Sequence, residues 1–193
     1  ASGMDAITQL LESYISRRAR PIPQALCVQG LQLAWPALPV AFRDGSDRSA
    51  RSRMAHASLL SGMALANSGL GLAHGVAAAL GVHARVPHGL ACAMMLPTAL
   101  RVNAQVRQTE LAELAQMLLP LSGVPSAQAA VQGLIEAAEQ MCADLGLPRR
   151  LSEVGVRREQ IASIVRDSYG SSMSANPREV SASELTALLE ALL

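Results

Sequence analysis

The sequence feature that most constrains the fold is a long stretch with almost no charge. Between Arg53 and Arg101 the only formally charged residue is Arg85, and the segment 57–82 contains none. Such a segment is long enough to span a bilayer, which requires about 20 apolar residues. It also contains glycines and polar side chains, and many of its apolar residues are alanine. These features favour two consecutive helices buried within protein, and we expect no membrane association.

The composition of the whole chain narrows the fold class further. Of the 193 residues, 50% are hydrophobic, 16% are charged and 2% are aromatic. Intrinsic disorder is excluded, because disordered chains are poor in apolar residues and rich in charge. A β-sandwich is disfavoured, because strands favour aromatic and β-branched residues where this chain uses alanine and leucine. We expect one all-α domain over residues 1–193, a multi-helix bundle of about eight helices.

Charge balance and cysteine content limit the partners and the compartment. The 16 basic residues are all arginine and face 15 acidic residues, so there is no basic excess for binding nucleic acid. Cys27, Cys92 and Cys142 are far apart and form no C-x-x-C pair. We expect small buried thiols in a cytoplasmic protein, with no disulfide framework.

Capping and proline signals predict where the helices lie. Capping boxes at Ser2 and Ser181 predict the starts of the first and last helices. The second helix opens at Pro21, and Pro36 and Pro39 are expected to kink or stop it. No segment alternates apolar and polar residues for long enough to predict a strand. The helices are expected over 3–16, 21–35, 47–66, a short segment ending at 80, 87–103, 108–119, 126–145, 157–168 and 181–192.

Four residues could carry chemistry. Asp5 and Gln9 are four apart, so both side chains project from one face of the first helix. His74 lies among small and apolar residues, and His88 lies between a proline and a glycine, which leave room for close approach. The helix dipole alone explains an acid in a first turn, and a buried histidine is more often part of a core. Two histidines and one carboxylate are nevertheless the minimal set for a divalent-metal site.

Other patterns indicate no additional site. His56 and His83 are not expected to be metal ligands. The glycines at 69, 71 and 75 resemble a dinucleotide-binding loop, but the spacing is one residue too long and no strand precedes it. The chain contains no Walker A, G-x-S-x-G or H-E-x-x-H motif.

Four motifs, read in order, resemble the iron-containing (group III) alcohol dehydrogenase family. The resemblance covers essentially the whole chain, with the order and spacing of the motifs preserved. The motifs are GMDAIT at 3–8, NSGLGLAHG at 67–75, LG at 80–81 followed by PHG at 87–89 and LP at 96–97, and NPRE at 176–179.

This resemblance implies that the chain corresponds to half of a two-domain subunit. The family has an N-terminal α/β domain that binds NAD or NADP through a Gly-rich loop, and a C-terminal helical domain that binds a divalent metal. The chain resembles the second domain only, so the nucleotide-binding domain would be its missing partner. We expect the fragment to be inactive by itself, and the complete protein to be a homodimer.

The resemblance also implies a ligand set for Fe²⁺ or Zn²⁺. In the family the metal is bound by an Asp, a His four residues later, and two further His. Asp5, His74 and His88 match three of these positions, while Gln9 stands where the second ligand would be His. An amide oxygen is a weaker ligand than imidazole, so we expect a reduced metal affinity. A second departure is Ala78, where many relatives carry a His near cofactor and substrate.

Three functional hypotheses remain open. The leading one is an NAD(P)-dependent oxidoreductase acting on an alcohol or aldehyde, in which the metal polarises the substrate oxygen during hydride transfer. The second is a metal-independent reductase of the same fold, similar to maleylacetate reductase, in which histidines polarise the substrate directly. The third is a non-catalytic helical interaction domain.

Overall fold

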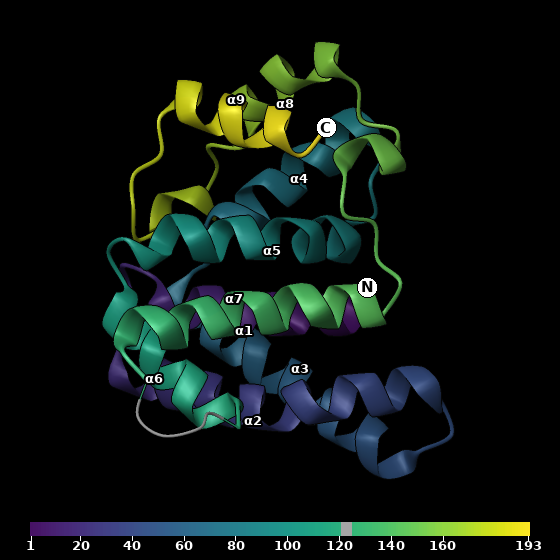
Figure 1. Cartoon of the computed structure of the whole chain (residues 1–193), viewed down its shortest axis with the longest axis vertical. Coiled ribbons are helices and arrows are strands. Elements are labelled where there is room, and N and C mark those ends of the chain that lie inside the picture. The colour runs from purple at the N-terminus through teal and green to yellow at the C-terminus, as the bar shows by residue number, and fades with distance from the viewer. Residues whose placement is uncertain (121–124) are drawn as a thin grey trace.

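Helices account for all the regular structure in the part of the chain described by the computed structural model, residues 1–120 and 125–193. These residues form nine α-helices and no strand, arranged as in Figure 1, which confirms the all-α prediction of about eight helices and matches the nine predicted ranges in number. Three short 3₁₀ helices connect the last elements. The α-helices are α1 (Ser2–Ile15), α2 (Pro21–Arg43), α3 (Arg48–Ser68), α4 (Leu72–Ala84), α5 (His88–Ala104), α6 (Gln108–Leu118), α7 (Ala127–Asp144), α8 (Ile161–Asp167) and α9 (Ala182–Ala191).

Two apolar clusters form the core, and α5 lies between them (Figure 1). The first cluster is built mainly from α1, α2, α6 and α7, and the second from α4, α5, α8 and α9. The residues Leu96 and Leu100 of α5 pack into the first cluster, while Met95 and Ala99 pack into the second. Helix α1 packs against both α5 and α4. The seam between the clusters is therefore where α1, α4 and α5 meet.

The charge-free stretch forms two helices joined at a sharp bend, as its glycines predict. Helices α3 and α4 are bent by 102° relative to each other. Gly69 adopts a φ of 72°, which favours glycine, and a Cβ on Gly71 would lie 2.7 Å from Asn176 Oδ1. Helix α4 is largely buried, whereas α3 exposes Leu59 and Met63 on one side. By length and hydropathy α2 is the one helix in the described part of the chain that could cross a membrane by itself.

Two helix boundaries differ from the sequence-based predictions. The capping box predicted at Ser2 is wrong, because Ser2 is already the first helical residue and Ala1 precedes it. The backbone N–H of Asp5 donates to the Ala1 carbonyl, and the Asp5 carboxylate contacts His74. The prolines were expected to kink or stop the second helix, and the stop is wrong, since α2 runs through Pro36 and Pro39 to Arg43. A kink there stays a prediction. Pro36 lies on the exposed side of α2, where water can satisfy the carbonyl that loses its intrahelical donor.

The helix start predicted at Ser181 is confirmed, with the serine half of the predicted capping box in place. The Ser181 hydroxyl accepts a hydrogen bond from the backbone N–H of Glu184 at the start of α9. A close approach of two helices is observed at the glycine that ends the second motif. A Cβ on Gly75 would lie 2.8 Å from the Ser168 carbonyl oxygen, so only glycine lets α4 approach the end of α8 this closely.

Candidate metal centre

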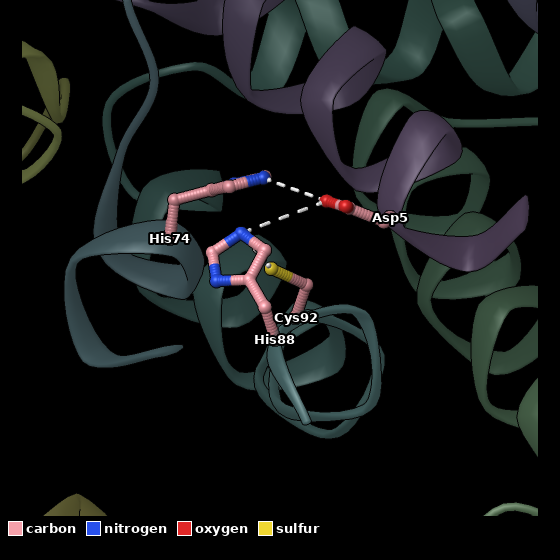
Figure 2. Close-up of side chains that lie close together, drawn as sticks. All are labelled: Asp5, His74, His88 and Cys92. Carbon is pink, nitrogen blue, oxygen red and sulfur yellow. Dashed lines mark hydrogen bonds and ion pairs between the residues drawn. The ribbon is translucent and has the colours of Figure 1, made fainter. Parts of the chain in front are cut away.

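Side chains from three helices meet at the seam between the two apolar clusters. Asp5 comes from α1, His74 from α4, and His88 and Cys92 from α5. One ligand atom from each residue lies within 4.8 Å of every other. Figure 2 shows both imidazole rings directed at the Asp5 carboxylate, with the Cys92 sulfur beside His88. Three of the four residues predicted from sequence are thus brought together.

His74 is held between two carboxylates and is only 3% exposed. Its Nδ1 lies 2.8 Å from Glu12 Oε2, and its Nε2 lies 3.1 Å from Asp5 Oδ1. Both ring nitrogens are therefore committed, and the ring cannot turn without breaking a buried hydrogen bond. This arrangement fixes Nε2 as the atom that faces the cluster.

Glu12 is a functional candidate that the sequence-based reasoning missed. The side chain is 2% exposed, and its oxygens accept hydrogen bonds from the backbone N–H groups of Gly71, Ala73 and His74 at the start of α4. These donors and the helix dipole stabilise a buried carboxylate. A carboxylate bonded to the outer nitrogen of a histidine is a common means of orienting a metal ligand. The signal in the sequence was the spacing of seven from Asp5, two turns along one helix face.

His88 and Cys92 present donors from one face of α5, because they are four residues apart. His88 Nε2 lies 3.9 Å from Asp5 Oδ1 and 3.5 Å from Cys92 Sγ. The His88 side chain is 52% exposed and that of Asp5 is 23% exposed, so the cluster opens to the surface on this side. Cys92 is buried, as predicted, but its position among these donors was not predicted.

The charges of the cluster are strongly coupled. Burial by itself would lower the pKa of His74, but its hydrogen bonds to Asp5, Cys92 and Glu12 outweigh burial and raise the pKa to about 12. Burial by itself would raise the pKa of Asp5, but the hydrogen bond and charge of His74, with smaller contributions from His88 and Cys92, together lower it. Burial raises the pKa of the Cys92 thiol. The raised pKa of His74 and the lowered pKa of Asp5 together favour an ion pair between these two side chains.

Gln9, the fourth residue predicted from sequence, has a protein partner outside this cluster. Its Oε1 lies 2.8 Å from the hydroxyl oxygen of Ser61 on α3. His56 is exposed, and His83 pairs with Asp167 through a 2.6 Å contact between Nε2 and Oδ2. Neither belongs to the four-residue cluster. That they are not ligands stays a prediction.

The glycine after His88 is needed for α5 to approach α1. A Cβ on Gly89 would lie 3.1 Å from the carbonyl atoms of Ala1 and 3.3 Å from Asp5 Cβ. These distances are tighter than ordinary side-chain contacts, so any larger residue would push the two helices apart. The Pro-His-Gly corner thus sets the separation between His88 and Asp5.

The donor chemistry of the cluster fits a divalent cation. A carboxylate oxygen and two imidazole nitrogens are ligands that Zn²⁺ and Fe²⁺ take in proteins, and a thiol is an additional ligand for Zn²⁺. The buried carboxylate of Glu12 provides the supporting hydrogen bond to His74. The fold and the site together define an all-helical domain with a candidate metal centre between its two apolar clusters.

Comparison with known proteins identifies the family. Residues 1–193 match the model of the Fe-containing alcohol dehydrogenase family, C-terminal, and the chain belongs to this family. It is 35% identical to a 1,3-propanediol dehydrogenase of Klebsiella pneumoniae over 97% of the chain and 49% of that protein. It is 32% identical to a lactaldehyde reductase of Escherichia coli strain K12, over 97% of the chain and 49% of that protein.

A solved structure gives the same result at the level of the fold. The structure of a 1,3-propanediol oxidoreductase matches with a TM-score of 0.96 and 32% identity, covering 99% of this chain and 50% of the other. The chain therefore spans about half the length of the relatives that it matches. The family resemblance and the helical fold expected from the four motifs are confirmed.

Proposed function

We propose that this chain is the metal- and substrate-binding half of an NAD(P)-dependent alcohol or aldehyde oxidoreductase. The observation that carries the proposal is the convergence of Asp5, His74 and His88 at one seam, in a member of the iron-containing alcohol dehydrogenase family. Two relatives are named as a 1,3-propanediol dehydrogenase and a lactaldehyde reductase. On that basis the proposed substrate is a small alcohol or aldehyde.

The nucleotide would be bound mainly by an N-terminal α/β half. This proposal is supported by the chain spanning about half of its relatives. A related structure, 25% identical with a TM-score of 0.88, is that of a sulfoacetaldehyde reductase from Bifidobacterium kashiwanohense in complex with NAD⁺. The homodimer and the cytoplasmic location remain predictions, as does the choice between NAD and NADP.

Asp5, His74 and His88 would bind the metal, each in a different way. A bound Fe²⁺ or Zn²⁺ supplies Lewis-acid polarisation of the substrate oxygen during hydride transfer. Asp5 contributes the negative charge, and its lowered pKa keeps it ionised at neutral pH. Glu12 accepts the Nδ1 proton of His74, so Nε2 is the nitrogen offered to a cation. Gln9 stays a predicted ligand, or a hydrogen-bonding group close to the site.

The surroundings of the site determine where protons and water can move. His74 and Cys92 are buried among apolar residues of α4 and α5, which keeps water from the inner side of the cluster. His88 is half-exposed, so substrate would enter on its side. Ala78 offers no imidazole four residues after His74, and a proton leaving the substrate hydroxyl would pass to water or to another group.

A metal-independent reductase is the second candidate, and one observation favours it. Both ring nitrogens of His74 are already engaged, with Glu12 at 2.8 Å and Asp5 at 3.1 Å, so a cation must displace the contact with Asp5 to bind Nε2. The fold also matches a maleylacetate reductase from Agrobacterium tumefaciens, with a TM-score of 0.79 and 27% identity. In this case the half-exposed His88 would polarise the substrate directly. A non-catalytic interaction domain is the third candidate.

Metal analysis combined with turnover separates the candidates. In the protein that contains both halves, NAD(P)H oxidation is measured with a panel of small aldehydes before and after chelation. We expect turnover that is lost on chelation and restored by Fe²⁺ or Zn²⁺. His88→Ala should abolish metal binding, whereas His83→Ala, a histidine outside the cluster, should not. Activity that survives complete metal removal would support the metal-independent reductase, and no turnover of any aldehyde would support the interaction domain.

A further inference from the structure

We propose that Cys92 supplies a thiolate ligand to the metal, in place of the imidazole that the chain lacks at Gln9. This inference rests on the proposed function, because it takes a metal bound by Asp5, His74 and His88 as its starting point. It assigns a role to a cysteine that sequence reasoning treated as an inert core residue. It also changes the donor set from a carboxylate with three imidazoles to a carboxylate, two imidazoles and one sulfur.

The distances within the cluster agree with a shared central atom. Bonds of about 2.0–2.3 Å to a tetrahedral zinc ion place neighbouring ligand atoms roughly 3.3–3.8 Å apart. The Cys92 Sγ lies 3.5 Å from His88 Nε2, and the two imidazole Nε2 atoms lie 3.1 and 3.9 Å from the same Asp5 oxygen. All pairs lie within 4.8 Å. Small side-chain movements would therefore complete the sphere.

The position of Cys92 on α5 explains why it faces the site. It follows His88 by four residues, so both side chains emerge from the same face of the helix toward α1 (Figure 2). The other cysteine near α5 behaves differently: Cys142 on α7 directs its thiol at the Ala93 carbonyl, 3.7 Å away. Cys142 thus provides a buried thiol outside the cluster, against which Cys92 can be compared.

The amide oxygen of Gln9 already has a hydrogen-bond partner in the protein. Its amide oxygen contacts the Ser61 hydroxyl on α3, which also lies 2.8 Å from the Ser58 carbonyl. This contact places the Gln9 amide oxygen, the atom that would bind a cation, against the Ser61 hydroxyl of α3. With Cys92 on α5 as a ligand in place of an imidazole at position 9 on α1, the number of protein ligands remains four.

A sulfur ligand changes which metal the site prefers. Thiolates are soft ligands that favour Zn²⁺, and together with Asp5 a thiolate gives the site two negative charges instead of one. We therefore expect the chain to bind Zn²⁺ more tightly relative to Fe²⁺ than a site of one carboxylate and three imidazoles would.

Cobalt substitution tests the inference without using enzyme activity. The metal-free protein is titrated with Co²⁺, and the absorption of a thiolate-to-cobalt charge-transfer band is followed in the near ultraviolet. We expect this band in the unaltered protein and in Cys142→Ser, and its loss in Cys92→Ser. Zn²⁺ affinity in Cys92→Ser should fall more than about 100-fold, because losing a direct ligand exceeds the cost of losing a supporting hydrogen bond. Adding Gln9→His to Cys92→Ser should restore affinity without restoring the band.

X-ray absorption of the zinc-loaded, unaltered protein gives a result that does not depend on a variant folding. One sulfur at about 2.3 Å from zinc is expected, beside nitrogen and oxygen at about 2.0–2.1 Å. Zinc bound by nitrogen and oxygen only would overturn the role of Cys92 and leave the proposed function standing. A protein that binds neither Co²⁺ nor Zn²⁺ would overturn both this inference and the metal-dependent function.

Discussion

The seam between the two apolar clusters has a closed end and an open end, and both contain polar residues. The closed end consists of Glu12, Asn103 and Asn176, which are at most 2% exposed. The open end consists of Asp5, His88 and Cys92, where two of the three side chains are partly or largely exposed. His74 belongs to both ends, since one ring nitrogen contacts Glu12 and the other contacts Asp5.

Hydrogen bonding distinguishes the two ends. At the closed end, donors and acceptors are matched: Asn176 Oδ1 accepts from the Leu72 N–H and from Asn103, and its amide nitrogen donates to the Arg178 carbonyl. At the open end, side-chain donors for a cation face one another within 4.8 Å. A matched polar network stabilises the fold, whereas ligand atoms gathered at one point are suited to binding. We therefore assign stability to the closed end and metal binding to the open end.

The largest expected effect comes from breaking the closed end at Glu12. In Glu12→Leu three backbone N–H groups and the imidazolium of His74 lose their acceptor inside the protein. Removing one partner of a buried ion pair costs about 3–5 kcal/mol, so the free energy of unfolding should fall by that amount in urea denaturation. Glu136→Leu, on the exposed side of α7, is the matched control and should change stability little. Equal stability of the two variants would contradict the assignment of the closed end.

At the open end, Asp5→Asn is expected to weaken metal binding strongly and to change stability little. The substitution removes the anionic ligand, and Zn²⁺ affinity measured by calorimetry should fall more than about 100-fold. The metal-free variant should lose much less stability than Glu12→Leu, because Asp5 is 23% exposed and His74 keeps its contact with Glu12. A stability loss as large as that of Glu12→Leu, with unchanged metal affinity, would show that the open end stabilises the fold and does not bind metal.

The two ends also differ in how far the sequence could predict them. The motifs around Asp5, His74 and His88 were recognisable because each lies in a short local pattern. Glu12 was not, because its partners at the start of α4 are about 60 residues away in the chain. Cys92 was buried as predicted, yet its role depends on how closely α5 approaches α1. These are tertiary contacts, and residue spacing along one helix cannot predict them.

The fold was more predictable than the site for a related reason. Helix type follows from local spacing, and nearly all helices lie close to their expected ranges. The errors arose where tertiary structure overrides a local rule. The Asp5 carboxylate contacts His74 on α4, and Pro36 is tolerated in α2 on its exposed side. The contact of Gln9 with Ser61 on α3 is also tertiary and could not be anticipated from its place one turn after Asp5. Its role as a ligand stays a prediction.

An intermediate effect is expected from separating the helices at the open end with Gly89→Ala. The added Cβ would lie 3.1 Å from the Ala1 carbonyl and 3.3 Å from Asp5 Cβ, so α5 must shift by a few tenths of an ångström. Zn²⁺ affinity should fall by roughly tenfold, since small misplacements of binding groups are costly. Gly133→Ala on α7 is the control, because its Cβ would meet only Leu119 at an ordinary 3.9 Å. Equal affinities in the two variants would show that this approach does not set the geometry.

The smallest effect on stability is expected for an imidazole–carboxylate pair at the surface, which has the same chemistry as the buried pair of His74 and Glu12. His83 and Asp167 are 2.6 Å apart, and Asp167 is also bonded to Arg166. Arg166 first, and then His83, lower the pKa of Asp167 to about 2. Because the folded-state pKa lies below the unfolded value of about 3.9, the pair contributes stability above that pH, and the contribution is lost as the pH falls through about 2.

Asp167→Asn tests this surface pair directly. The variant should be slightly less stable than the unaltered protein at pH 5, and the difference in urea midpoint should disappear as the pH approaches 2. Solvent screens an exposed pair, so the difference should be far smaller than that caused by Glu12→Leu. A difference that stayed constant between pH 5 and pH 2 would mean that the carboxylate charge is not its source. An imidazole and a carboxylate thus contribute little stability in the pair His83–Asp167, which water surrounds, and much more in the pair His74–Glu12, which protein surrounds.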